Sequence, residues 1–209
     1  MVVVDKKLKY AFRMVHIENI PHILRFGIVR VDSPNRNPEY VPIGDKEVIW
    51  KRQNRLLTSQ QKVSDFIPFY FGPRTPMLYV IQHGYNGVKR VDAEKLVYCI
   101  VRLDDIINNH IDCMFTDGHV LNRLSEVYDG NRLKYVDNYI HYHDVYALSW
   151  DSEKDNDLKR RKEAELLLKN DLPVQYIKGF VVFNERAKQQ LCAMGVAEKE
   201  VVIRADYYF

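Results

Sequence analysis

One carboxylate stands out among the residues that could do chemistry. Glu165 lies in the apolar run at residues 164–168 and follows the basic cluster at residues 159–162. A carboxylate among apolar residues is costly unless it is paired or used for catalysis. Spacing alone leaves two interpretations open, an exposed glutamate on the polar side of a strand and a catalytic carboxylate.

A histidine and two aromatic residues form a second pattern. His16 stands at the end of the first expected strand, and Tyr70 and Phe71 stand at the end of a central one. A lone histidine at a strand end is usually an ordinary hydrogen-bonded surface or core residue. The sequence alone does not separate that case from a functional pairing.

A third pattern could hold a metal ion. His141 and His143 lie two residues apart, so on a strand both imidazoles would share one face. Asp144 follows them, and His110 and Asp112 could complete the site. His-x-His spacing is also common by chance in a tyrosine-rich polar stretch, and we expect no metal site here.

Other motifs of enzyme chemistry are missing from the sequence. It contains no Walker loop, no Gly-x-Gly-x-x-Gly segment, no nucleophile elbow and no Cys-x-x-Cys pair. Its three cysteines, Cys99, Cys113 and Cys192, are widely spaced within apolar stretches, which indicates buried, reduced thiols.

Length and charge bound the class of protein. The 209 residues fit one domain better than two, and with 46% hydrophobic and 28% charged residues the chain is not disordered. A net charge of +3 allows a polyanionic partner without the strongly basic face of a duplex-DNA binder. The apolar run at residues 1–4 is too short for a secretory signal, and no window reaches the ~18 apolar residues of a membrane helix. We therefore expect a cytoplasmic protein.

The first expected elements are a strand and a helix. Tyr10–His16 is rich in aromatic and branched residues, which predicts a strand. Asn19 can cap the helix that follows, Pro21 is tolerated in its first turn, and Gly27 supplies a left-handed stop. Residues 46–62 then form the most basic stretch in the first half of the chain.

The remaining elements are mostly short strands. Strands are expected at residues 66–71, 77–81, 96–101, 178–183 and 200–209, and helices at 151–161 and 185–194. Residues 164–168 fit either a strand or a helix, and residues 122–150 are hard to assign. Many strands and few helices, out of regular alternation, indicate an α+β fold.

Five segments, taken in order, resemble one family of enzymes. They are RMVHIENIPHIL at 13–24, VIWKR at 48–52, DFIPFYFGPRTPML at 65–78, FTDGH at 115–119 and KEAELL at 162–167. Together they are similar to DarT, the DNA ADP-ribosyltransferase toxin of the DarT–DarG toxin–antitoxin system. The chain departs from the family where it ends in Tyr-Tyr-Phe instead of Trp-Tyr-Phe, and residues 122–150, which would form the substrate loop, match only loosely.

The resemblance implies a fold and a reaction. The expected fold is a single ADP-ribosyltransferase-like domain over residues 1–209, with a split mixed β core, flanking helices and NAD in an extended cleft. The expected enzyme is a toxin that cleaves NAD at the nicotinamide–ribose bond and moves ADP-ribose onto a thymine ring nitrogen in single-stranded DNA. The implied modification is sequence-dependent, blocks replication and requires no metal. The implied partner is the DarG antitoxin, whose macrodomain removes the modification and whose other part binds the toxin.

Two residues carry the implied chemistry. Cleavage passes through an oxocarbenium-like ribose, so a carboxylate held beside the sugar stabilises the transition state more than the ground state. Glu165 matches that carboxylate and would also hold a nicotinamide-ribose hydroxyl. Arg52 matches the residue that contacts the NAD phosphates and assists deprotonation of the thymine. Because a guanidinium stays protonated in proteins, Arg52 fits stabilisation of a developing anion better than proton acceptance, and both roles stay open.

The resemblance also places residues along the NAD and DNA sites. Residues 13–16 would line the nicotinamide end, Tyr70 and Phe71 would stack on the nicotinamide ring, and His16, Tyr70 and Glu165 would match the His–Tyr–Glu pattern of related transferases. The full set expected to bind NAD is Arg13, Met14, Val15, His16, Asn19, His22, Arg30, Arg52, Tyr70 and Phe71. The residues expected to contact DNA, with ordinary surface charge as the alternative, are Arg74, His119, Arg160 and Arg161.

Two other functions compete with this interpretation. The first keeps the fold and moves ADP-ribose onto RNA or protein. The second is a metal-dependent nuclease or a non-catalytic nucleic-acid module centred on His141, His143 and Asp144. Strict dependence on NAD and insensitivity to chelators would exclude the second.

Overall fold

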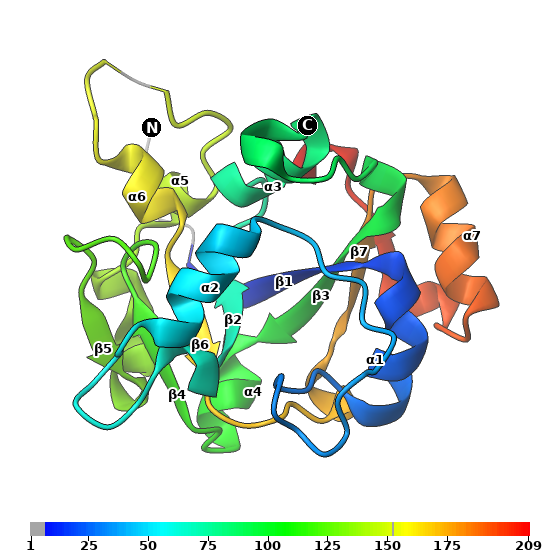
Figure 1. The fold of residues 1–209 in the computed structure, drawn as a ribbon, viewed down its shortest axis with the longest axis horizontal. Coiled ribbons are helices and arrows are strands. Elements are labelled where there is room, and N and C mark those ends of the chain that lie inside the picture. The colour runs from blue at the N-terminus through cyan, green and yellow to red at the C-terminus, as the bar shows by residue number, and fades with distance from the viewer. Residues whose placement is uncertain (1–6, 152) are drawn as a thin grey trace.

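The computed structural model describes residues 7–151 and 153–209, and its strands form one eight-stranded sheet (Figure 1). The strands are β1 (Tyr10–His16), β2 (Ile67–Tyr70), β3 (Leu96–Arg102), β4 (Cys113–Thr116), β5 (Val127–Asp129), β6 (Glu165–Leu168), β7 (Gly179–Val182) and β8 (Val201–Ile203). Their order is β5-β4-β6-β2-β1-β3-β7-β8, and the paired strands run antiparallel except for the parallel pair β7 and β8. The sheet is mixed, and the single parallel pair, β7 and β8, which α7 connects, stands beside antiparallel pairs, so the predicted α+β class is confirmed.

The sheet is split at its centre. β1 pairs with β3 along its whole length, from Tyr10 opposite Arg102 to His16 opposite Leu96. On its other side, β1 pairs with β2 only where Phe12 lies opposite Tyr70. The two strands are therefore free to diverge on either side of that pair, which gives the predicted split core and leaves room for a cavity.

Helices cover both faces of the sheet. They are α1 (Ile20–Phe26), α2 (Lys46–Asn54), α3 (Pro76–His83), α4 (Leu103–Asn108), α5 (Tyr142–Val145), α6 (Leu158–Lys162) and α7 (Glu185–Ala193). On one face, α1, α4 and α7 bury Ile20, Ile106 and Leu191, and on the other α3 buries Leu78 and Ile81. Helices cover both faces of the sheet at β3. Every residue of this strand except the last is therefore buried, as its continuous apolar sequence predicts.

The segment at residues 77–81 is a helix, and the prediction of a strand there was wrong. α3 begins after Thr75, whose side chain accepts a hydrogen bond from the Leu78 amide, and carries Pro76 in its first turn. It ends at Gly84, which has the left-handed conformation. These cap residues outweigh the strand propensity of the branched and aromatic residues between them.

Two other boundaries differ from expectation, and one open assignment is resolved. The strand expected at residues 200–209 ends at Ile203, and a 3₁₀ turn follows at Ala205–Tyr207. The helix expected at residues 151–161 begins only at Leu158, while residue 152 lies outside the described part of the chain. The run at 164–168, left open between helix and strand, becomes β6 from Glu165.

A glycine at the end of α1 gives a test of this packing. Gly27 has φ +78°, and a Cβ there would lie 2.1 Å from the carbonyl oxygen of Leu172. Gly87 has nearly the same φ, +71°, but a Cβ there meets nothing within 4 Å. We expect Gly87→Ala to cost about 1 kcal/mol from backbone strain alone, and Gly27→Ala to cost at least ~2 kcal/mol more in urea unfolding. Equal losses would show that the contact with Leu172 is not tight.

Candidate active site

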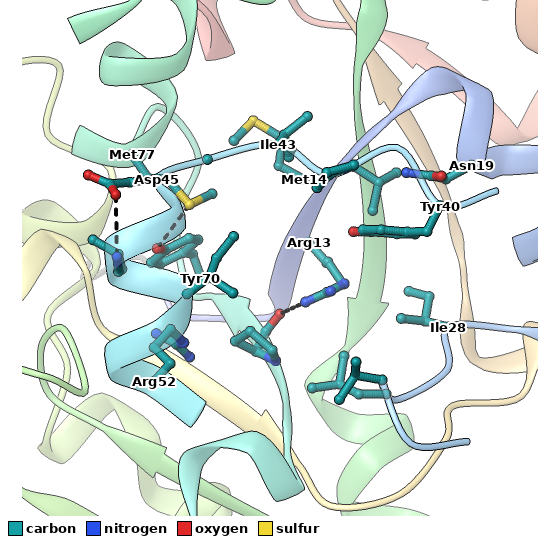
Figure 2. A pocket seen from close by; sticks show the side chains of 18 of the residues that line it. Arg13, Met14, Asn19, Ile28, Tyr40, Ile43, Asp45, Arg52, Tyr70 and Met77 are labelled. Carbon is teal, nitrogen blue, oxygen red and sulfur yellow. Dashed lines mark hydrogen bonds between the residues drawn. The ribbon is translucent and has the colours of Figure 1, made fainter. Parts of the chain in front are cut away.

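A cavity of about 1010 Å³ lies at the split between β1 and β2 (Figure 2). Helices α1, α2 and α3 and the segment between α1 and α2 complete its wall. Drug-sized ligands occupy pockets of roughly 300–1,000 Å³, so this cavity has room for a dinucleotide. The residues predicted to bind NAD or DNA that border it are Arg13, Met14, Val15, Asn19, His22, Arg30, Arg52, Tyr70 and His119.

Arg52, which borders the cavity, forms a two-pronged ion pair with the fully buried Glu165. The Arg52 Nη1 and Nη2 atoms lie 3.0 and 2.7 Å from Oε1 and Oε2 of Glu165. Oε1 also accepts a hydrogen bond of 3.0 Å from the backbone N–H of Val120. Glu165 itself is 0% exposed, so the alternative of an exposed glutamate on a polar strand face is wrong.

Four elements converge to build this pair. β6 lies between β2 and β4, so Glu165 stands opposite Tyr70 on one side and Thr116 on the other. Arg52 comes from α2, which carries no buried residue and begins at Asp45, whose side chain accepts from two backbone amides of the first turn. The ion pair therefore ties an otherwise exposed helix to the centre of the sheet.

Burial and the neighbouring charges shift the pKa values of the ionisable groups at the site. Burial alone would raise the pKa of Glu165, but the charges of Arg52 and His119 and the hydrogen bonds it accepts outweigh burial and hold its pKa below the usual value. Burial and the charge of Glu165 raise the pKa of Tyr70 well above its usual range. Burial and the charge of Arg52 lower the pKa of His119, although Glu165 opposes them. At neutral pH the site thus holds a carboxylate, a guanidinium, a neutral phenol and a neutral imidazole.

Three further predicted residues shape the wall. Asn19, expected to cap α1, makes no cap hydrogen bond; its side chain instead binds the backbone of Val41 through two hydrogen bonds of 2.8 and 2.9 Å. The segment between α1 and α2 is thereby held over the cavity. Arg30 pairs with Asp32, and Arg13 donates to the carbonyl oxygen of Pro68, 2.9 Å away (Figure 2).

Three residues expected to contact NAD do not border the cavity: Phe71, His16 and Glu165, which is fully buried and paired with Arg52. Phe71 follows Tyr70 directly, and because side chains alternate across a strand it points to the opposite face, into the core against Phe115. Of the two aromatic rings expected to stack on nicotinamide, only that of Tyr70 therefore borders the cavity. The buried His16 accepts a hydrogen bond of 3.3 Å from the Glu18 amide and starts the turn before α1, which is the ordinary role weighed for it.

The residues expected to contact DNA do not form one patch. His119 borders the cavity beside Glu165, whereas Arg74 borders a second hollow of about 390 Å³ together with three tyrosines and lies 4.1 Å from the ring centroid of Phe209. Arg160 and Arg161 are held in ion pairs to aspartates, namely Asp117, Asp144, Asp155 and Asp157. Their guanidinium groups already have partners that a phosphate would have to displace.

The residues considered as metal ligands do not form a cluster in the described part of the structure. Asp144 pairs with Arg161 and Asp112 with Lys169. Across residues 7–151 and 153–209, no three His, Cys, Asp or Glu side chains stand close enough together to hold a metal ion. Cys99 and Cys113 are buried free thiols, and Cys192 is a half-buried one. Over the same residues, no helix is long and apolar enough to cross a membrane.

Several residues of the cavity were not predicted from the sequence. Among them are Tyr40, Asp45, Met77 and Glu163. Met77 was missed because its segment resembled a strand. Glu163 stands two residues before Glu165 but ends α6 with φ −97° and ψ 22°, so the alternation of an extended strand does not identify it.

Comparisons with known proteins agree with this geometry. The sequence model of the DarT family, described as ssDNA thymidine ADP-ribosyltransferase, matches residues 12–209. A DNA ADP-ribosyl transferase of Escherichia coli O127:H6 is 29% identical over 184 residues, which cover 86% of this chain and 83% of that protein. A DNA ADP-ribosyl transferase–DNA ADP-ribosyl glycohydrolase fusion protein of Thermosipho africanus is 26% identical over 186 residues, covering 88% of this chain and 45% of that one.

Solved structures give the same fold. Thermus sp. 2.9 DarT in complex with ADP-ribosylated ssDNA superposes with a TM-score of 0.80 at 22% identity and covers 100% of both chains. The same Thermus protein in complex with NAD+ has a TM-score of 0.77 at 21% identity, covering 98% of this chain and 99% of that one. The family match spans nearly all of the sequence, and the chain belongs to the DarT family of single-stranded-DNA thymidine ADP-ribosyltransferases.

Proposed function

We propose that this chain transfers ADP-ribose from NAD+ onto thymidine in single-stranded DNA, and that Glu165 and Arg52 carry the reaction. The observation that supports the proposal most strongly is the fully buried Glu165 carboxylate, held ionised by Arg52, which itself borders a cavity of dinucleotide size. Loss of nicotinamide leaves positive charge on the ribose, and a fixed carboxylate beside that charge lowers the barrier. The apolar neighbours of Glu165 reduce screening of this interaction.

The donors of the cavity wall fit NAD+. Arg13 borders the cavity, and its Nε atom is buried with no hydrogen-bond partner in the described structure, so it is an unsatisfied donor in the cavity wall. Arg30 and Arg52 supply positive charge for the two phosphates, and Tyr70 supplies a ring for nicotinamide. When NAD+ enters, Glu165 exchanges part of its contact with Arg52 for a ribose hydroxyl.

The path of the DNA is proposed from the same geometry. His119 lies beside Glu165, where the target base must arrive. The second hollow, with Arg74, Tyr142, Tyr146 and Tyr207, offers the aromatic rings and positive charge that suit a flanking nucleotide. We assign Arg160 and Arg161 to holding the loop before α6, since both are tied to its aspartates.

The biological role is proposed from the family resemblance. We propose that the chain acts in the cytoplasm as a toxin that blocks replication by modifying thymidine in a sequence-dependent manner. A DarG-type antitoxin would reverse the modification with its macrodomain and bind the toxin through its other part. The fusion of transferase and glycohydrolase in the Thermosipho africanus protein supports such a pairing.

Mass spectrometry of a modified oligonucleotide tests this function. We expect a thymidine-containing single strand to gain the mass of one ADP-ribose when NAD+ is present, and the same sequence without thymidine to gain nothing. Addition of a chelator should change neither result. Unmodified DNA beside labelled RNA or labelled protein would contradict the proposed acceptor and favour the alternative substrates.

A further inference from the structure

The proposed reaction leaves one proton unassigned. Joining ADP-ribose to a thymine ring nitrogen removes the hydrogen on that nitrogen, and such an N–H is a weak acid at neutral pH. Arg52 is a poor acceptor, because burial lowers its pKa but the charge and hydrogen bonds of Glu165 more than reverse this and raise it. Glu165 is also unsuited, since both of its oxygens accept hydrogen bonds and its pKa is lowered.

Two other proton acceptors at the cavity are already engaged. His119 Nδ1 accepts a hydrogen bond of 3.3 Å from the Leu121 amide, so in the neutral ring the hydrogen sits on Nε2 and no free lone pair faces outward. Asp45 caps α2 by accepting from the amides of Glu47 and Val48. Neither group can take a proton without breaking the contact that positions it.

Glu163, unlike His119 and Asp45, is a proton acceptor whose carboxylate is not engaged by any residue that the structure describes. It borders the same cavity, and within the described part of the chain no hydrogen bond or ion pair engages its carboxylate. Its backbone N–H donates to the Arg160 carbonyl oxygen at 3.1 Å, which fixes it at the end of α6, just before β6 begins. The buried Ala164 separates it from Glu165, and the two carboxylates lie close enough for the charge of Glu165 to act on Glu163.

The surroundings of Glu163 suit proton transfer near neutral pH. Burial and the negative charge of Glu165 raise the pKa of Glu163 to about 7, against the opposing charges of Lys159, Arg52 and Lys162. Two carboxylates in one site cannot both stay strongly acidic, and Arg52 stabilises the charge of Glu165. A general base works best when its pKa lies near the working pH.

We propose that Glu163 is the general base of the transfer and removes the ring proton of the target thymine; this rests on the proposed function. The carboxylate of Glu163 takes the proton, and the freed electron pair on nitrogen forms the bond to the ribose carbon. The bond between that carbon and nicotinamide breaks, its electron pair stays on the ring nitrogen, and nicotinamide leaves as a neutral molecule. Glu163 then returns its proton to water.

Glu163→Gln tests the proposal, because glutamine keeps the shape and cannot accept the proton. At pH 7 we expect transfer to thymidine-containing single-stranded DNA to fall by about 10²-fold, with the affinity for NAD+ unchanged. The wild-type rate should rise with pH through about 7 and then level off, following ionisation of Glu163. The variant should lack this inflection, and Glu198→Gln, which changes an exposed carboxylate paired with Lys188, should keep it.

A more acidic acceptor separates base catalysis from structural damage. An oligonucleotide with 5-fluoro-2′-deoxyuridine at the target position loses its ring proton more easily and depends less on a base. We expect it to restore much of the activity of Glu163→Gln relative to the wild-type protein on the same strand. An equal deficit on both strands, or a variant as active as the wild type, would overturn the proposal while the function stands. If the wild-type protein modifies neither strand, the proposed function and this assignment both fail.

Discussion

Glu165→Gln is expected to lower the rate of ADP-ribose transfer by on the order of 10³-fold. The substitution keeps the size of the side chain and removes the negative charge that faces the ribose as nicotinamide departs. Because the charge acts mainly in the transition state, kcat should fall while the dissociation constant for NAD+ changes little. Single-turnover labelling of a thymidine-containing oligonucleotide measures the first quantity, and calorimetric titration with NAD+ measures the second.

Thermal unfolding and a matched variant distinguish a loss of catalysis from a loss of folding. Glu165 forms a buried ion pair, so its replacement also leaves Arg52 without its partner. Thermal unfolding of Glu165→Gln therefore has to accompany the kinetics, and Glu200→Gln, at an exposed position, serves as the control. A folded Glu165→Gln protein with transfer near the wild-type rate would remove Glu165 from the mechanism.

Arg52→Ala moves the acidic limb of the pH–rate profile to higher pH. In the wild-type protein the pKa of Glu165 is held low by Arg52 against the effect of burial. Arg52 also lowers the pKa of Glu163, so without the guanidinium the pKa values of both carboxylates rise. The rise of the rate that Glu163 sets near pH 7 therefore moves to higher pH. We also expect transfer at pH 7 to drop by at least ~10²-fold, because Arg52 faces the phosphates of NAD+ in the proposed complex.

Two further variants test whether the geometry and the position of the charge matter. Arg52→Lys keeps one positive charge but loses the two-pronged geometry, so its acidic limb should lie between those of Arg52→Ala and the wild type. Lys51→Ala removes the neighbouring cation, which pairs with Glu47 on the exposed side of α2, and should leave the profile unchanged. A profile of Arg52→Ala that keeps the wild-type acidic limb would contradict the role assigned to the ion pair.

Local sequence signals predict the elements that have a single strong pattern. The continuous apolar run of β3 gives a strand with both faces covered, and Pro21 and Gly27 bracket α1 as expected. Glu165 is identifiable because a carboxylate in an apolar run demands a partner. The partner, Arg52, lies 113 positions earlier, and only the resemblance to DarT connects the two in the sequence.

The remaining features depend on tertiary contacts that no local pattern records. Residues 77–81 have the composition of a strand, but the cap at Thr75 and the core contacts of Leu78 make them a helix. Phe71 was assigned to the site with Tyr70, although the alternation of a strand places neighbours on opposite faces. Burial and the negative charge of Glu165 distinguish Glu163, with its pKa near 7, from an ordinary surface glutamate.

Parallel measurement of released nicotinamide and of ADP-ribose on DNA decides whether cleavage of NAD+ is coupled to modification of thymidine. We predict that the wild-type protein, supplied with NAD+ and a thymidine-containing single strand, releases one nicotinamide for each ADP-ribose attached to thymidine. Both quantities should fall together in Glu165→Gln. Nicotinamide release without modification of the strand would contradict transfer to DNA, and equal modification of strands that lack thymidine would contradict thymidine as the acceptor.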